Sequence, residues 1–83
     1  MAKKAKRHDG IIAIVAANVK RLRNGRNPKL SREKLGFEAD LDRTYISAVE
    51  RRKRNITISV LARLAKALKV RPAELVEPPP KRR

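Results

Sequence analysis

The chain has 83 residues, and its 23 lysines and arginines against 8 aspartates and glutamates give a net charge of +15 at pH 7. This length allows one domain and this charge indicates a polyanionic partner, whereas aromatic residues make up only 2%, which argues against a base-stacking sheet for single-stranded nucleic acid. Because the chain has no cysteine and one histidine, we expect no disulfide, no zinc or other metal site, and no cofactor.

The first predicted helix spans about residues 10–23 and follows a basic tail. Its apolar run at residues 11–17 lies behind several cations, as in a secretory signal, but the run is short and apolar residues continue at helical spacing through Val19 and Leu22. A membrane span would need about 20 apolar residues. We therefore assign the run to a helix of the folded domain and expect no membrane partner.

Two short helices are predicted after a loop rich in breaker residues at positions 24–28. Ser31 is expected to cap the first, which ends near Asp40, and Asp42 is expected to cap the second, which spans residues 43–51. The apolar residues expected to face the core at helical spacing are Leu35, Ala39, Ile46 and Val49.

Two further helices complete the predicted fold. Thr57 is expected to cap the fourth helix, and Pro72 suits the first position of a short fifth helix. The inward stripe predicted for the fourth helix consists of Ile58, Leu61, Leu64, Ala65 and Leu68. No stretch alternates apolar and polar residues as a half-buried strand does. The sequence therefore predicts a compact all-α domain of five helices over residues 10–77, between a flexible basic tail, residues 1–9, and a basic tail rich in proline, residues 78–83.

Residues 31–51 have the length of a helix-turn-helix unit. On a helical wheel of its second helix, the side opposite Ile46 and Val49 carries small, polar and cationic side chains, namely Arg43, Thr44, Ser47, Ala48 and Arg51. Arginine can bond guanine in the major groove, and threonine offers a hydroxyl and a methyl group to a base edge. The basic residues 51–54 suit phosphate oxygens beside the groove. This pattern indicates binding to the major groove of double-stranded DNA.

Three segments also carry a family resemblance. LSREKL at residues 30–35, LDRTYIS at residues 41–47, and VER followed by RN within residues 49–55 resemble the phage-repressor/Cro-type (XRE-like) helix-turn-helix family. The pattern from residue 41 onward is particularly similar to restriction-modification controller proteins. The resemblance covers about residues 11–76. It implies a lambda-repressor-like fold and a transcriptional regulator, not an enzyme, that binds an inverted-repeat operator as a homodimer and can regulate its own promoter.

The resemblance also implies a role for individual residues. The base-reading residues would be Arg43, Thr44, Ser47 and Arg51. The phosphate-binding residues would be Ser31, Arg32, Tyr45, Lys53, Arg54 and Asn55. Two of these assignments have alternatives, since Arg43 could contact a phosphate instead and the ring of Tyr45 could pack against the core. Glu50 matches an acidic residue that pairs with an arginine of the first helix in relatives, and Arg23 is the matching cation here.

The sequence departs from the family pattern at three positions. Asp40 stands at a turn position that is often glycine and must adopt a positive φ, which Asp tolerates better than most residues. Gly36 stands where the family usually has a small, helix-packing alanine, and it should weaken its helix by roughly 1 kcal/mol unless close packing against a neighbouring helix requires glycine. Arg52 replaces a glycine that commonly ends the recognition helix, so the sequence does not determine the backbone path of residues 51–55.

Self-association is expected through Val70, Leu75 and Val76, because one recognition helix reads too few base pairs for useful specificity. With no room for an effector domain, we expect no small-molecule ligand, and regulation would follow from protein concentration and dimerisation. An antitoxin-type protein that also binds a protein partner and a non-specific architectural DNA-binding protein are the alternatives. His8 and Asp9 with a serine do not make a credible catalytic site, since no oxyanion donor is identifiable. The expected location is the bacterial or phage-infected cytoplasm, at the nucleoid.

Overall fold

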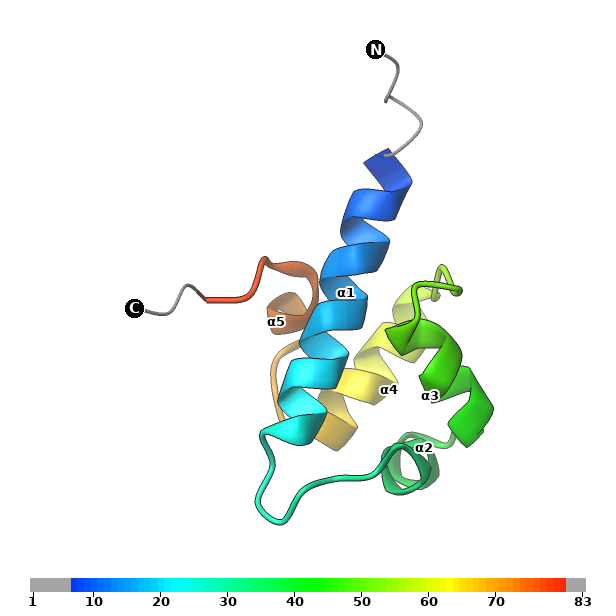
Figure 1. Ribbon diagram of the computed structural model, residues 1–83, viewed down its shortest axis with the longest axis vertical. Helices are drawn as coiled ribbons and strands as arrows, with labels where there is room; N and C mark the ends of the chain where they lie inside the picture. The colour runs from blue at the N-terminus through cyan, green and yellow to red at the C-terminus, as the bar shows by residue number, and fades with distance from the viewer. Residues whose placement is uncertain (1–6, 81–83) are drawn as a thin grey trace.

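Figure 1 shows the computed structural model of the chain, in which five helices are joined by short loops. The structure describes residues 7–80, and side chains from Gly10 onward. Of the predicted tails, residues 1–6 and 81–83 lie outside the described residues, whereas residues 7–9, expected in the N-terminal tail, are helical. The helices are α1 (Arg7–Asn24), α2 (Arg32–Ala39), α3 (Arg43–Glu50), α4 (Ile58–Leu68) and α5 (Pro72–Val76). No strand occurs within residues 7–80, so the prediction of an all-α, five-helix fold is confirmed.

The longest helix, α1, organises the others. It contacts α3, α4 and α5, while α2 packs against α3 and α4. In Figure 1, α5 lies on one side of α1 and α3 on the other, with α2 below. The largest fully buried aliphatic side chains come from all five helices and are those of Val19, Leu35, Ile46, Val49, Leu64 and Leu75. No helix within residues 7–80 has the length and apolar character needed to cross a membrane.

Two of the predicted N-caps make the expected hydrogen bond. The Ser31 hydroxyl accepts from the backbone N–H of Lys34 at 3.0 Å, and the Thr57 hydroxyl accepts from that of Val60 at 3.1 Å. Asp42 occupies the N-cap position of α3, but its carboxylate makes no capping bond. It accepts the hydroxyl hydrogen of Thr44 instead.

Three helices end on a residue other than glycine in the left-handed region. Asp40, Arg52 and Lys69 have φ values of 59°, 64° and 62°. After each of these residues, the next backbone N–H donates to a carbonyl five residues earlier, as Leu41 does to Gly36 at 2.7 Å. This is the Schellman arrangement, which normally places glycine at the left-handed position. The positive φ predicted for Asp40 is therefore present, and Arg52 adopts the conformation of the glycine it replaces.

Three details of the predicted fold are wrong. The helix α1 begins at Arg7, earlier than the expected Gly10, because a glycine in the first turns of a helix is tolerated at about 1 kcal/mol or less. The helix α3 ends at Glu50, one residue before the predicted end. Ile58 does not face the core and is 84% exposed, because it is the first residue of α4 and no other element covers it.

A buried asparagine fastens the C-terminal segment to α1. Asn18 is 0% exposed, and its amide nitrogen donates to the carbonyls of Leu75 at 3.0 Å and Glu77 at 2.7 Å. Its amide oxygen accepts from Arg21 at 3.0 Å. Because a buried amide without partners would be unfavourable, these bonds fix the position of α5 relative to α1.

Candidate nucleic-acid interface

The helix α3 is rotated so that its polar side faces solvent. Ile46 and Val49 point into the core and are 0% and 2% exposed. The side chains that are exposed or half-buried along the rest of the helix and at its end include those of Arg43, Thr44, Ser47 and Arg51. The two buried anchors thus leave the four predicted base-reading residues accessible to a ligand.

A polar hollow lies between the N-terminus of α2 and the outer side of α3. It is lined by Arg23, Lys29, Ser31, Arg32, Glu33, Arg43 and Ser47. The fold therefore brings two predicted base-reading residues, Arg43 and Ser47, next to two predicted phosphate-binding residues, Ser31 and Arg32. Lys29 was absent from the predicted site, although its position two residues before the N-cap of α2 could have indicated it.

A buried carboxylate joins the three helices around this hollow. Glu50, at the end of α3, has a side chain only 2% exposed. Arg23 of α1 donates to it through Nε at 2.7 Å and Nη2 at 3.0 Å, and also donates through Nη1 to the carbonyl of Leu30 at 3.0 Å. Arg32 of α2 donates to Glu50 through Nε at 3.0 Å. The pair implied by the family resemblance is thus extended by a second arginine.

The hydrogen bonds around Glu50 determine the ionisation state of its carboxylate and the orientation of Arg32. Burial alone would raise the pKa of Glu50, but the hydrogen bonds from Arg23 and Arg32 outweigh burial and hold that pKa below its ordinary value. The carboxylate is therefore ionised at neutral pH. Because Arg32 uses Nε for this bond, its two terminal nitrogens are held at the edge of the hollow as further donors.

Thr44 is oriented by its neighbour at the start of α3. Its hydroxyl donates to the Asp42 carboxylate, and this bond is the main cause that holds the pKa of Asp42 below its ordinary value. The hydroxyl hydrogen is therefore engaged within the protein. The lone pairs of its oxygen and the methyl group are the parts of Thr44 that a base could contact.

The basic loop after α3 is held close to the helix end. Arg52 donates its backbone N–H to the carbonyl of Val49 at 3.1 Å, and Lys53 donates its own to that of Ala48 at 2.8 Å. All five residues from 51 to 55 are exposed. The loop thus continues directly from the outer side of α3.

Tyr45 packs on the core and supports one cation of this loop. Its ring is half-buried against the hydrophobic cluster, which bears out the packing alternative for the ring. The guanidinium carbon of Arg54 lies 4.7 Å from the ring centroid, within cation–π range. The Tyr45 ring therefore restrains Arg54, and a phosphate contact by Tyr45 stays a prediction.

Arg63 of α4 is a positioning residue that the sequence analysis missed. Its Nε donates to the carbonyl of Ala39 at 3.1 Å and its Nη2 to that of Asp40 at 2.6 Å. These are carbonyls at the C-terminus of α2, where the turn to α3 begins. An arginine on an amphipathic helix carries no sequence signal for such a long-range bond, so only the fold reveals it.

The predicted self-association residues are only partly suited to that role. Leu75 is 0% exposed within the single chain, so it belongs to the core and this part of the prediction is wrong. Val70 is half-buried against the core, whereas Val76 is 37% exposed. The sequence could not separate these three residues, because apolar residue types alone do not reveal which side of α5 packs on α1.

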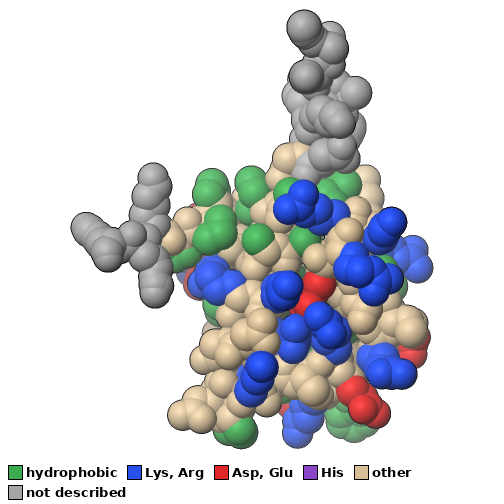
Figure 2. All heavy atoms as spheres, in the orientation of Figure 1, with side chains coloured by type: hydrophobic (Ala, Val, Ile, Leu, Met, Phe, Trp, Pro, Cys, Tyr) green, Lys and Arg blue, Asp and Glu red, His purple; other side chains and the backbone are tan. Residues whose placement is uncertain are grey.

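Positive charge is spread widely over the face shown in Figure 2. Lys and Arg side chains cover much of the right-hand part of this view, where α3 and its following loop lie in Figure 1. A surface of this kind attracts a polyanion over distances longer than a hydrogen bond.

Comparisons with known proteins agree with this geometry. A helix-turn-helix family model matches residues 19–75, which is more than half of the chain. The chain is 48% identical over 48 residues to the control protein C.BamHI of Bacillus amyloliquefaciens, covering 58% of this chain and 59% of that protein. It is 53% identical over 55 residues to the control protein C.SmaI of Serratia marcescens, covering 66% of this chain and 63% of that protein. The chain thus spans less than two thirds of each of these relatives.

A solved structure also resembles the fold. The restriction-modification controller protein C.AhdI from Aeromonas hydrophila superposes with a TM-score of 0.71 at 36% identity, over 77% of this chain and 94% of that one. The motifs at residues 30–55 predict this similarity. The chain therefore belongs to the phage-repressor-type (XRE-like) helix-turn-helix family, with restriction-modification controller proteins among its relatives.

Proposed function

We propose that the protein is a sequence-specific, double-stranded DNA-binding transcriptional regulator that acts as a homodimer on an inverted-repeat operator. The observation that carries this proposal is the accessible face of α3, where Arg43 and Ser47 line one hollow with the cations around the N-terminus of α2. The names of the controller-protein relatives support the same function.

In the proposed complex, α3 lies in the major groove. Arg43, Thr44, Ser47 and Arg51 contact base edges, with Arg43 suited to a bidentate bond to guanine. The phosphate contacts come from the residues flanking α3, namely Ser31, Arg32, Tyr45, Lys53, Arg54 and Asn55. Because these contacts displace counterions from DNA, the affinity falls steeply as salt concentration rises.

A dimer doubles the sequence that is read. One recognition helix contacts only a few base pairs, whereas a two-fold dimer places two such helices on half-sites about 34 Å apart. Regulation then depends on protein concentration, through the monomer–dimer equilibrium and occupancy of the operator. This mode suits a regulator of its own promoter in the bacterial cytoplasm.

Selection of bound sites from random duplex DNA tests this proposal. The wild type should enrich an inverted repeat, and Arg43→Ala should lose information at one base position of each half-site, with a loss of about 1–3 kcal/mol there. Lys66→Ala is the matched control, since it removes one exposed positive charge from α4, outside the proposed interface. It should preserve the selected motif. If the wild type enriches no motif, or if both variants weaken all sequences equally, the base-reading assignment is wrong.

A further inference from the structure

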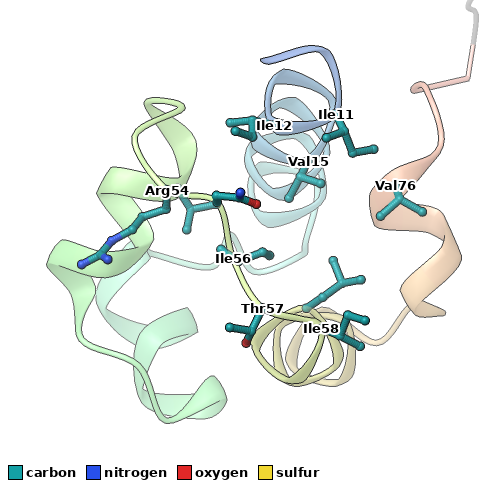
Figure 3. Close-up of a pocket in the computed structure, with 11 residues that line it drawn as sticks. Ile11, Ile12, Val15, Arg54, Ile56, Thr57, Ile58 and Val76 are labelled. Carbon is teal, nitrogen blue, oxygen red and sulfur yellow. The ribbon is translucent and has the colours of Figure 1, made fainter. Parts of the chain in front are cut away.

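The two ends of α3 have different surroundings. The C-terminal end borders an apolar hollow of about 190 Å³, which Figure 3 shows among side chains of α1, α5 and the segment before α4, and which Val49 of α3 also lines. The N-terminal end carries Asp42, Arg43 and Thr44, which are exposed and do not line that hollow. A base that meets this end of α3 therefore meets charges and hydrogen-bonding groups.

Asp42 is an unexpected residue for a surface that binds DNA. Residues 41–55 contain two carboxylates, and the other one, that of Glu50, is buried against arginines. The Asp42 side chain is exposed, and an exposed carboxylate repels the phosphates of DNA. Capping of α3 does not account for it, because the side chain makes no capping bond. Its side-chain partner is the hydroxyl of Thr44.

The hydrogen bond between these two side chains has a fixed direction. An ionised carboxylate has no hydrogen to donate, so the Thr44 hydroxyl is the donor. The carboxylate is ionised at neutral pH, because the bond from Thr44, together with the smaller effect of the charge on Arg43, holds the pKa of Asp42 below its ordinary value. A hydroxyl has only one hydrogen. With that hydrogen bound to Asp42, Thr44 can accept a hydrogen bond from a base but cannot donate one.

We propose that Asp42 is a positioning residue that makes the Thr44 hydroxyl an acceptor and thereby selects adenine or cytosine on the strand that Thr44 faces. In the major groove, adenine presents its N6 amino group and cytosine its N4 amino group, whereas guanine O6 and thymine O4 are acceptors. Against O6 or O4, Thr44 would set lone pairs against lone pairs. This inference rests on the proposed function and names the class of base that is read at one position of each half-site.

The charge of Asp42 acts in the same sense as the bond. A carboxylate beside a base edge attracts an amino group and repels a carbonyl oxygen. Without Asp42, the Thr44 hydroxyl could turn and donate, so it could bond to any of the four bases. A polar contact that is lost without replacement lowers affinity by about tenfold. The expected discrimination is therefore about tenfold at the position that Thr44 contacts.

Selection of bound sites from random duplex DNA with Thr44→Val locates this position. Valine keeps the branched shape of threonine but has no hydroxyl. The wild type should enrich adenine or cytosine about tenfold over guanine and thymine at one position of each half-site, and Thr44→Val should lose that preference. Enrichment of guanine or thymine at the position that depends on Thr44 would overturn the inference. So would a Thr44→Val selection that matches the wild type at every position.

Asp42→Ala tests the positioning role itself. The substitution removes the acceptor for the Thr44 hydroxyl, and α3 loses no side-chain capping bond. The preference for adenine or cytosine should fall to about twofold or less, while every other position of the motif stays as in the wild type. Glu38→Ala is the matched control, since it removes one exposed carboxylate from α2, outside the proposed DNA contacts. It should keep the preference.

Both variants should bind all sequences more tightly, because each removes a negative charge that repels DNA. Only a change confined to the Thr44 position supports the inference. A preference that survives in Asp42→Ala, or that falls equally in Glu38→Ala, would overturn it.

Binding to an altered base tests the contact directly. Purine in place of adenine, or 2-pyrimidinone in place of cytosine, lacks only the amino group. The wild type should bind an operator with this replacement about tenfold less tightly than the natural operator, beyond any loss that Thr44→Val also shows. An equal loss in the two proteins would trace the effect to weaker base pairing and overturn the inference.

A titration without DNA separates this inference from the proposed function. Carbon-13 NMR of the Asp42 carboxyl should give a pKa below 3.8 in the wild type and a pKa closer to that value in Thr44→Val, which lacks the donor. The same pKa in both proteins would show that the bond is absent in solution. That result, or a wild-type motif that Asp42→Ala leaves unchanged, defeats the inference and leaves the regulator proposal standing. If the wild type enriches no motif, both fail.

Discussion

Gly36 lies in α2, where two physical effects predict opposite outcomes for the substitution Gly36→Ala. Alanine favours the helical conformation over glycine by about 1 kcal/mol, which alone would stabilise the protein. However, a Cβ atom at this position would lie 2.5 Å from the carbonyl oxygen of Leu41 and 3.3 Å from the backbone nitrogen of Arg43. Both atoms belong to the backbone that carries α2 into α3. Neither can move aside as a flexible side chain could.

The geometry decides which effect is larger. An ordinary carbon contact begins at 3.4 Å, so the Leu41 carbonyl must move by about 0.9 Å to admit the methyl group. Overpacking of this kind costs about 1–3 kcal/mol, and a clash with backbone belongs at the upper end of that range. After subtraction of the helix gain, we expect Gly36→Ala to lower the free energy of unfolding by about 2 kcal/mol. For a domain of this size, that loss lowers Tm by about 8–16 °C.

Thermal unfolding followed by circular dichroism provides the assay, with Gly10→Ala as the matched control. Gly10 is also helical, but a Cβ atom there would meet nothing within 4 Å. Gly10→Ala should therefore raise Tm, by the helix effect alone. If Gly36→Ala raises Tm as well, the argument that close approach of α2 and α3 requires a glycine is refuted.

Two further predictions concern buried polar groups. Glu50→Gln should destabilise the protein by about 3–5 kcal/mol at pH 7, because it leaves the buried Arg23 without a charged partner. Since the pKa of Glu50 is lowered on folding, the unfolded chain takes up the proton first as pH falls below the ordinary value of 4.5, and the wild type then loses this stability. Urea unfolding at several pH values measures the difference in the free energy of unfolding between wild type and variant, and this difference should narrow below that pH. A difference that is constant with pH would contradict the lowered pKa of Glu50. Asn18→Ala should free the carbonyls of Leu75 and Glu77, at about 1–3 kcal/mol. Relative to the wild type, amide hydrogen exchange should then be faster in α5 but not in α2. Unchanged exchange in α5 would show that other contacts hold that helix.

Local signals in the sequence were sufficient to predict the helices, and to predict where α2, α3, α4 and α5 start. Ser31, Thr57 and Pro72 mark helix starts because a side-chain acceptor or a fixed φ acts within a few residues. The arrangement of Arg23 with Glu50 followed only from the family resemblance. The bonds of Arg32 and Arg63 to distant elements have no local signal, and they appear only when the helices are packed.

Ile58 and Leu75 show why periodicity was insufficient at the edges of the core. A spacing pattern states which residues share a face, but not how far the neighbouring helices extend along it. Ile58 shares the face of Leu61 yet lies beyond the cover that its neighbours provide. Leu75 was expected at a self-association surface around the short last helix, whereas Asn18 holds α5 against α1 and Leu75 is buried. For the candidate interface, the sequence therefore predicted the types of residues more completely than the positions of their side chains.

The left-handed helix ends set backbone stability against surface charge in this small protein. Glycine would relieve backbone strain of about 1 kcal/mol at each of Asp40, Arg52 and Lys69, yet charged residues occupy all three sites. At Arg52 the side chain adds a cation beside the proposed DNA surface, so a consensus-designed variant with glycine there would gain thermal stability while losing electrostatic attraction for its ligand. Lys69 lies outside the α2–α3 region, so a glycine there offers stabilisation without that conflict. Thermostabilisation of this fold should therefore begin at residue 69 and spare residue 52.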